Sequence, residues 1–272
     1  MSLMYENFFN LLRTPFARDI PCAQLYSTPA FDELQARLSF AARTRLFCVV
    51  TGDVGVGKTT AMRKFNASLD PALFTCVYLS DSALTPRVFY WEILKVLINL
   101  EKPSLYRSEG KQKMMNALTA MLEAGRQTPV IIIDEAHLLS NEMLEETRFL
   151  LNYKMDSQNP MCLIIVGQND LRLKLARDFY EPITQRIDFR FKLLPFDRAQ
   201  THDYILNHLA YAGESRQIFS DPAVDAIFAY SNGSARKVNK LCSLAMMSAV
   251  QRNTRIIDDS LIAFVIDQEL TW

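Results

Sequence analysis

The sequence lacks several features that mark membrane, secreted or fibrous proteins. Its 30 Lys and Arg residues are balanced by 30 Asp and Glu residues, so the formal net charge is zero and no overall field attracts nucleic acid or a membrane surface. The longest apolar runs, such as residues 161–166, have the length of a strand and are far too short to span a bilayer. We find no secretory signal, internal repeat or low-complexity linker. Any contact with DNA must therefore depend on local charge, and we expect no membrane partner.

The cysteines show no metal-binding or disulfide pattern. They are odd in number, lie far apart and include no C-x-x-C pair. Four of them lie in apolar runs that we expect to be core. This predicts reduced, buried thiols and a cytoplasmic location, rather than a disulfide framework or a zinc site. The five residues are Cys22, Cys48, Cys76, Cys162 and Cys242.

Strand-like runs alternate with helical patterns up to Pro195. The 272 residues, 49% of them hydrophobic, are enough to bury an α/β core and a small second domain. The alternation predicts a parallel sheet with helices on both faces. After Pro195 the strand signal disappears, and helices are expected to start at Asp197, at Asp221 as N-cap before Pro222, and at Asp258 with Asp259. The expected strands are residues 47–51, 74–79, 130–134, 161–166 and 189–193.

One motif predicts binding of a nucleoside triphosphate. Residues 52–59 fit the phosphate-loop pattern G-x-x-x-x-G-K-[ST], between the first expected strand and a helix-forming stretch from Thr60. Glycines let the backbone wrap close to phosphates, so that its N–H groups and the positive end of the next helix meet the anion. Lys58 would reach the β- and γ-phosphates of ATP, and the Thr59 hydroxyl would bind Mg²⁺. The residues assigned to the nucleotide are Gly52, Asp53, Val54, Gly55, Val56, Gly57, Lys58, Thr59 and Thr60.

A second motif indicates hydrolysis as well as binding. The apolar run 129–133 ends in Asp134 and Glu135, as expected of a strand beside the phosphate loop. Asp134 would hold the magnesium, and Glu135 would orient and polarise the attacking water. The alternative interpretation is an acidic cap where a strand meets a helix. A lone histidine at this place is more often a packing residue than a base, so we assign His137 no catalytic role.

Several motifs together resemble one family over nearly the whole chain. They are YENFFNL at 5–11 with Pro15 and Phe16, DEAHLL at 134–139, VGQ at 166–168 and QRI at 185–187. They are similar to the ExeA-type (general secretion pathway protein A-like) AAA+ ATPases. The resemblance implies a P-loop AAA+ core, with a five-stranded parallel sheet flanked by helices, and a small all-α lid. We therefore expect an N-terminal helical segment packing on the core (1–45), the α/β domain (46–194) and the lid (195–272).

The resemblance also implies roles for three further residues. Gln168 falls at the sensor 1 position, and Arg236, in the motif GSAR at 233–236, resembles sensor 2 and would reach the γ-phosphate. Arg186 matches the region that supplies an arginine finger to a neighbouring subunit, so a homo-oligomer, a ring or a filament, is expected. The alternatives are solvated surface charges and, for Arg236, an ordinary basic helix. Arg172, Arg177 and Arg190 are nearby candidates for the finger.

The biological process is expected from the resemblance alone. Short members of the group resemble the transposition ATPases similar to MuB, TniB and TnsC, which assemble on target DNA and recruit or activate a transposase. This implies ATP-dependent assembly on double-stranded DNA and hydrolysis stimulated by oligomerisation, DNA or a partner. The alternative is an ATPase for secretion or envelope assembly, whose full-length members need a membrane span and a periplasmic region that do not fit before Trp272. An initiator-like ATPase normally implies a further winged-helix domain.

Candidate DNA contacts lie in the segment 82–113, where related transposition ATPases present DNA-facing residues. Contacts of this kind would be directed to phosphates and strongly salt-dependent. The equally plausible alternative is a solvated helix face with a basic loop. The candidate residues are Arg87, Arg107, Lys111 and Lys113.

Overall fold

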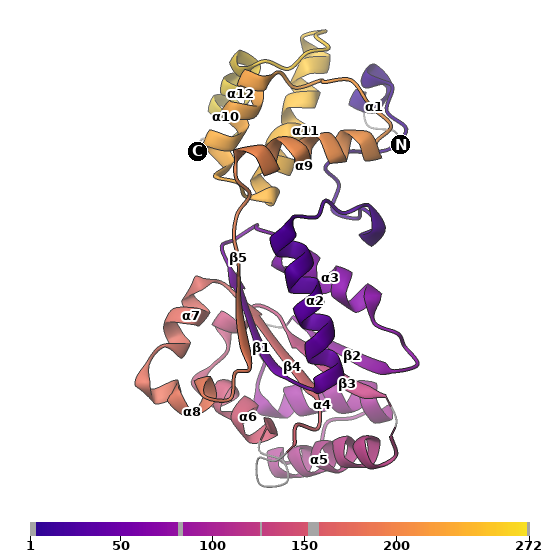
Figure 1. Ribbon diagram of the computed structural model, residues 1–272, viewed down its shortest axis with the longest axis vertical. Coiled ribbons are helices and arrows are strands. Elements are labelled where there is room, and N and C mark those ends of the chain that lie inside the picture. Colours follow the sequence, from indigo (N-terminus) through magenta and orange to yellow (C-terminus); the bar gives the residue numbers. More distant parts are fainter. Residues whose placement is uncertain (1–3, 81–83, 126, 152–157, 271–272) are drawn as a thin grey trace. The chain divides into compact units, whose positions relative to one another are not determined.

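The computed structural model describes residues 4–80, 84–125, 127–151 and 158–270 (Figure 1). The chain forms two compact units. The helical unit contains Met1–Pro29, Asp53–Gly57 and Leu194–Trp272, and the sheet unit contains Ala30–Gly52 and Lys58–Leu193. Residues 1–45, grouped above as one segment, thus fall in both units, while the proposed division at Pro195 stays a prediction. No helix in the described ranges is both long and apolar enough to cross a membrane.

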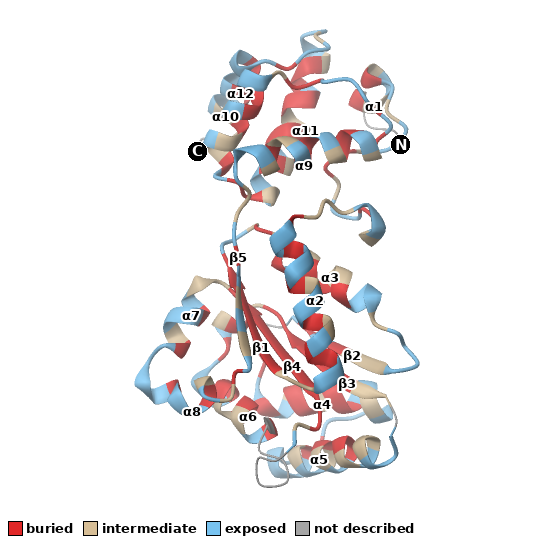
Figure 2. Cartoon of the chain, viewed as in Figure 1, coloured by how far each residue is buried: buried red, intermediate tan, exposed pale blue. Residues whose placement is uncertain are grey.

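The sheet unit is built on five parallel strands in the order β2-β3-β4-β1-β5. β1, β4 and most of β3 are buried along their length, because a central parallel strand is covered on both faces and favours apolar, β-branched residues (Figure 2). All five expected strands and the parallel sheet are confirmed, with ends shifted by at most two residues. The strands are β1 (Phe47–Gly52), β2 (Phe74–Leu79), β3 (Thr128–Ile133), β4 (Cys162–Gly167) and β5 (Phe189–Leu193).

Helices surround this sheet and complete its core. α4 begins where the Thr85 side chain accepts a hydrogen bond from the Val88 N–H, with Pro86 in its first turn, and it ends at the left-handed Asn99. α4 lies beside α5 (Figure 1). The helices of this unit are α2 (Pro29–Thr44), α3 (Lys58–Ser68), α4 (Pro86–Ile98), α5 (Arg107–Glu123), α6 (Asn141–Leu151), α7 (Asn169–Leu175) and α8 (Glu181–Thr184), with short turns η2 (Ala136–Leu138) and η3 (Asp178–Tyr180).

The helical unit confirms the helical character expected after Pro195. Asp197 forms a capping box with Gln200, and Asp258 caps its helix through the Leu261 N–H. One start was wrong by a residue: Ser220, not Asp221, caps α10, because its hydroxyl accepts from the Ala223 N–H. The elements are α1 (Met4–Phe9), η1 (Cys22–Gln24), α9 (Arg198–Tyr211), α10 (Asp221–Ser231), α11 (Ala235–Gln251), α12 (Asp259–Val265) and η4 (Ile266–Leu270).

Residues 5–16 pack on the helices of the same unit. Tyr5, Phe9 and Phe16 are buried in one apolar cluster with side chains of α9 to α12. The Phe16 N–H donates to Nδ1 of His208 at 3.0 Å, and the two rings stack with centroids 5.1 Å apart. Burial lowers the pKa of His208 to about 4, so the ring is neutral and Nδ1 can accept this hydrogen bond.

Candidate nucleotide-binding site

The carboxylate of Asp134 is the centre of the candidate site in the sheet unit. It directly follows β3 and is only 3% exposed. Its Oδ2 accepts hydrogen bonds from the hydroxyls of Thr59 and Tyr78, both at 2.8 Å, and its Oδ1 accepts from the Glu135 N–H at 2.8 Å. Neutral donors from three elements therefore fix the orientation of a buried negative charge, without neutralising it.

Lys58 brings a buried cation to the start of α3. Its residue is 7% exposed, and its ammonium donates to the carbonyl of Gly52 at 2.9 Å. Gly52 ends β1 and Lys58 begins α3, so the two ends of the phosphate loop are tied together. The positive end of a helix and a lysine at the same place favour a bound phosphate. Thr60 follows in the first turn of α3.

The residues at Asp134 fit a magnesium ion that also binds phosphate and water. The Thr59 hydroxyl and the Asp134 carboxylate supply hard oxygen atoms 2.8 Å apart, the ligand type that Mg²⁺ prefers. In the described ranges, at this site as elsewhere, no three His, Cys, Asp or Glu side chains gather as a set of metal ligands, so water and a ligand would have to complete the coordination. A magnesium ion held here would thus be the kind that arrives with a nucleotide.

Glu135 differs from its neighbour in exposure and backbone. Its side chain is 42% exposed, and its φ of 52° lies in the left-handed region, which is uncommon for a residue with a side chain. Its Oε2 lies 3.4 Å from Nδ1 of His137. An exposed carboxylate directly after a buried one is suited to contact water. The contact between His137 and Glu135 was not predicted from the sequence.

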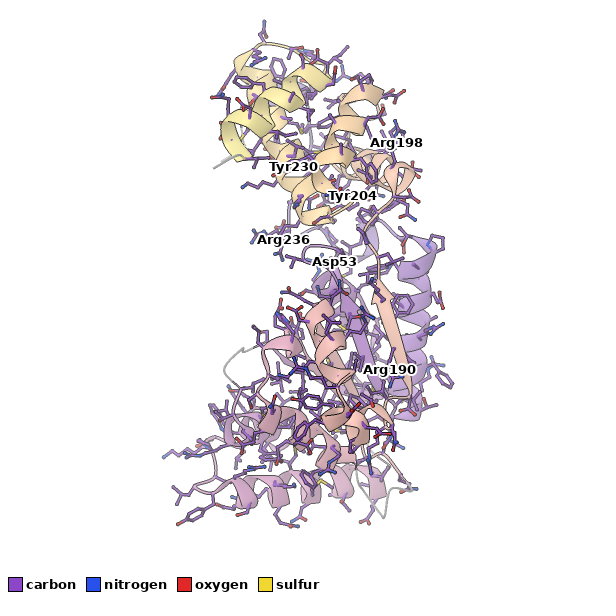
Figure 3. The ribbon with its side chains drawn as sticks, turned by 90° about the vertical axis from the view of Figure 1, so that its left-hand side faces the viewer. Asp53, Arg190, Arg198, Tyr204, Tyr230 and Arg236 are labelled. Carbon is purple, nitrogen blue, oxygen red and sulfur yellow. The ribbon has the colours of Figure 1, made fainter. Side chains whose placement is uncertain are left out.

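The middle of the phosphate loop, Asp53–Gly57, lies in the helical unit with the expected sensor 2 segment. The Arg236 N–H donates to the Gly55 carbonyl at 3.1 Å, and the Ser234 hydroxyl donates to the Val54 carbonyl at 3.3 Å. Figure 3 shows Arg236 next to Asp53. Gly55 has φ of 81°, and a Cβ there would collide with the Ser234 hydroxyl, so only glycine allows this close approach. Arg236 itself is exposed.

A second glycine leaves open space beside the loop backbone. Gly57 has φ of 102°, and a Cβ at this position would meet no atom within 4 Å. Glycine is required here by the left-handed backbone conformation, and not by a lack of space for a side chain. Open space next to a glycine-rich turn allows a ligand to approach the main chain, as phosphate binding needs. The residues present fit a triphosphate.

The structure places the sensor 1 and finger candidates at the two ends of the same chain segment. Gln168 is half-buried at the N-cap of α7, directly after β4. Arg186 is half-buried, and its guanidinium donates to the Pro182 carbonyl at 2.9 Å; Arg190 donates to the Thr184 carbonyl at 2.6 Å. Arg172 and Arg177 are exposed on and after α7. The catalytic roles of Gln168 and Arg186 stay predictions.

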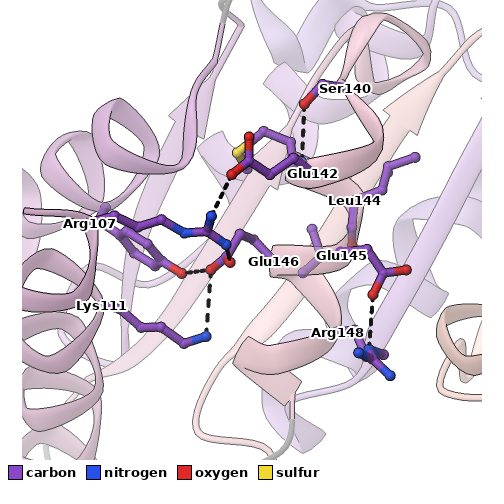
Figure 4. A network of polar contacts seen from close by, with 11 residues as sticks. Arg107, Lys111, Ser140, Glu142, Leu144, Glu145, Glu146 and Arg148 are labelled. Atoms are coloured by element: carbon purple, nitrogen blue, oxygen red, sulfur yellow. Dashed lines mark hydrogen bonds and ion pairs between the residues drawn. The ribbon is translucent and has the colours of Figure 1, made fainter.

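The four candidate DNA contacts all have partners within the chain. Arg107 pairs with Glu142 and Glu146, and Lys111 lies 3.7 Å from Glu146 (Figure 4). Lys113 lies 2.7 Å from Glu109. Arg87 donates to the Ser104 carbonyl at 2.8 Å. A DNA contact by these residues stays a prediction, but their charges already have structural partners. Ser82 and Ala83, at the start of the expected segment, lie outside the described residues.

Two polar contacts of buried carboxylates were missed from the sequence. One is Tyr78, whose hydroxyl binds Asp134, and the other is the fully buried Glu146, which binds Tyr90, Arg107 and Lys111. Tyr78 could have been found by aligning β2 with β3, as argued below. Glu146 gave no signal, because a single acid on an amphipathic helix is ordinarily solvated.

Comparison with known proteins identifies the fold. Residues 41–175 match the model of an AAA domain family. The chain is 29% identical over 281 aligned positions to general secretion pathway protein A of Aeromonas hydrophila. That alignment covers 99% of this chain and 50% of the relative, so the chain spans about half the length of this curated protein. The chain belongs to the AAA+ ATPases.

Solved AAA+ structures share this fold at low sequence identity. A chain of Drosophila ORC bound to DNA superposes with a TM-score of 0.71 and 17% identity, covering 98% of this chain and 66% of that one. Cdc6p from Pyrobaculum aerophilum superposes with a TM-score of 0.67 and 18% identity, covering 89% and 67%. These structures confirm the P-loop AAA+ fold. The resemblance to general secretion pathway protein A is confirmed by the sequence identity and the AAA domain match. The likeness to transposition ATPases stays a prediction.

Proposed function

We propose that this AAA+ protein binds ATP with Mg²⁺ and hydrolyses it to ADP and phosphate. The observation that carries the proposal is the 2.8 Å contact between the Thr59 hydroxyl and the buried Asp134 carboxylate, with Glu135 next in the chain. A phosphate-loop hydroxyl and a strand-end carboxylate are the pair that holds Mg²⁺ in phosphate-loop enzymes. The AAA+ family itself implies hydrolysis of a nucleotide.

The candidate residues have distinct roles in this proposal. The loop backbone and Lys58 bind and orient the phosphates, and Thr59 and Asp134 would hold the metal, which neutralises developing charge when bound. Glu135 holds the attacking water and polarises it, while Gln168 helps to place it. The assignment of Arg236 to the γ-phosphate rests on the resemblance of GSAR at 233–236 to sensor 2. Positioning and charge stabilisation account for most of the catalysis expected.

We further propose that hydrolysis depends on assembly. Arg186 would come from a neighbouring copy and stabilise charge on the transferring phosphoryl group, so a single subunit would have an incomplete site. ATP would then favour the packed interface, and hydrolysis would loosen it. This makes the nucleotide a switch between assembled and separate states.

A role in secretion or envelope assembly is the process that we place first. It is supported by the 29% identity to general secretion pathway protein A over nearly the whole chain. This sequence identity is higher than the 17% and 18% identity to the ORC and Cdc6p structures, which support the fold alone. The five free cysteines support action in a reducing compartment, as expected of the cytoplasm.

A DNA-assembling regulator of transposition is the second candidate. It is favoured by the start of α11, where Lys237 and Lys240 are exposed beside Arg236 in a helix without acidic residues. Cations at the positive end of a helix repel one another and the dipole, and a bound phosphate backbone would relieve that repulsion. Recruitment of a transposase rests on the family resemblance.

Three variants test the catalytic proposal. We expect Lys58→Ala to lose ATP binding, and Glu135→Gln to bind as tightly as wild type while hydrolysis falls by about a hundredfold or more. Arg186→Ala should bind ATP with little hydrolysis. Arg190→Ala, which removes the alternative finger candidate of the same segment, should hydrolyse ATP like wild type. Mixing Arg186→Ala with Glu135→Gln should restore part of the hydrolysis, because one subunit supplies the finger and the other supplies Glu135. Normal hydrolysis by Glu135→Gln would contradict the proposed chemistry.

One measurement separates the two processes. The Glu135→Gln variant is mixed with duplex DNA, with and without ATP, and followed by electron microscopy and by binding at increasing salt. ATP-dependent filaments or rings on DNA, with affinity falling steeply with salt, would support the DNA-assembling regulator. Absence of DNA association at low salt would leave the secretion-type role.

A further inference from the structure

Tyr78 is the unexpected partner of the carboxylate assigned to magnesium. Its hydroxyl donates to Oδ2 of Asp134 at 2.8 Å, the same oxygen that accepts from Thr59 at 2.8 Å. Tyr78 is nevertheless 43% exposed, so its ring contributes little to the core. A half-exposed ring whose hydroxyl reaches a buried carboxylate is placed for that hydrogen bond rather than for packing.

The register of the sheet explains why this residue can reach Asp134. Tyr78 of β2 lies directly beside Ile132 of β3, and Asp134 follows Ile132 by two residues. Side chains two apart on a strand point to the same face, so Tyr78 and Asp134 share one face of the sheet. The Asp134 N–H also donates to the Leu79 carbonyl at 2.8 Å, which fixes the end of β3 against β2.

The chemistry of the phenol suits a carboxylate that must stay ionised. A phenol is an O–H donor at neutral pH, so the Tyr78 hydroxyl can donate to the ionised Asp134 carboxylate. The hydroxyl occupies one lone pair of Oδ2 and limits rotation of the carboxylate group. The Glu135 N–H holds the other oxygen, Oδ1, while Thr59 donates to Oδ2 beside Tyr78.

We propose that Tyr78 is a positioning residue for the metal: it holds Asp134 in the orientation that binds magnesium. Tyr78 lies on β2, outside both the phosphate loop and the motif of Asp134 and Glu135. This inference rests on the proposed ATPase function and adds a residue to it. Without the hydroxyl, Asp134 has more rotational freedom and must be ordered when the metal binds. The cost falls on metal affinity, while contacts between the loop and the phosphates are unchanged.

The test is magnesium-dependent nucleotide binding by Tyr78→Phe. Affinity for a fluorescent ATP analogue is measured in EDTA and then against increasing Mg²⁺, and Mn²⁺ binding to the ADP complex is followed by electron paramagnetic resonance. We expect the half-saturating Mg²⁺ and Mn²⁺ concentrations to rise about tenfold, as loss of a hydrogen bond to a charged group predicts, with affinity in EDTA within about twofold of wild type.

The matched control is Thr75→Val. It removes a hydroxyl from the same strand, where Thr75 donates to Gln127 at 2.8 Å, far along β2 from Asp134. Its metal dependence should equal that of wild type. If Tyr78→Phe also equals wild type while wild type binds Mg–ATP, the inference about Tyr78 is overturned and the ATPase proposal stands. If wild type shows no magnesium-dependent binding, both are overturned. A thermal melt of each variant checks that it is folded.

Discussion

Two buried carboxylates of the sheet unit show how the same group serves two purposes. Asp134 and Glu146 each accept a hydrogen bond from a tyrosine, Tyr78 and Tyr90 respectively. Glu146 is also bound by the cations Arg107 and Lys111, whereas Asp134 accepts from hydroxyls and a backbone N–H. The charge of Glu146 is therefore neutralised by the protein, and the charge of Asp134 remains available to a metal ion.

The pairing of Glu146 with cations also explains why basic residues expected to contact DNA lie where they do. Burial, with the nearby Arg107 as a second cause, lowers the pKa of Lys111, and its ammonium lies 4.1 Å from the centre of the Phe149 ring. The ammonium of Lys111 therefore links α5 to α6 and is less available to a ligand. The basic residues of 82–113 thus have a structural explanation that does not need DNA.

Breaking the neutralised pair should have the largest effect on stability. Glu146→Gln removes the charge that Arg107 and Lys111 share, and leaves the two cations close together, with the exposed Glu142 still paired to Arg107. We expect a loss of about 3 kcal/mol in the free energy of unfolding, at the low end for buried pairs because Arg107 is partly solvated. Chemical denaturation measures it. Magnesium-dependent ATP affinity should not change, and a large change would mean that Glu146 acts in the nucleotide site.

The fold and much of the site followed from the sequence for physical reasons. Central strands need continuous apolar runs, and a phosphate loop needs fixed glycines, so β1, β3 and the residues 52–59 were recognisable. Tyr78 was missed because one tyrosine on an edge strand has no local pattern; it requires the register with β3. Glu146 was missed because the three helices that bury it are brought together only in the folded chain.

Acid should weaken the helical unit through a third buried group. The pKa of His208 is lowered by burial from 6.5 to about 4, so the unfolded state binds its proton more readily. The stabilisation is complete above about pH 6.5 and is lost as the pH falls towards 4. Between pH 7 and 4.5 this amounts to about 2 kcal/mol. Denaturant unfolding of wild type and His208→Gln at both values measures it.

The comparison with His208→Gln isolates the imidazole from the carboxylates that also titrate in this range. The amide can still accept a hydrogen bond from the Phe16 N–H but has no proton to gain. We expect the pH dependence of the variant to be flatter by the amount given. Equal slopes for the two proteins would show that His208 titrates alike in the folded and unfolded states.

The smallest effect is expected at Lys113, where the charge pair is open to solvent. Its ammonium lies 2.7 Å from Glu109, one helical turn earlier, with both side chains about 40% exposed. Exposed pairs of this kind contribute little, so Lys113→Gln should shift Tm by no more than about 1 °C. If Lys113 instead contacts DNA phosphates in the assembled state, the same substitution should lower the slope of log affinity against log salt by about one. Duplex binding by wild type and Lys113→Gln, titrated with salt, therefore distinguishes a solvated helix face from a DNA contact, because the first predicts parallel lines and the second predicts lines that converge as salt rises.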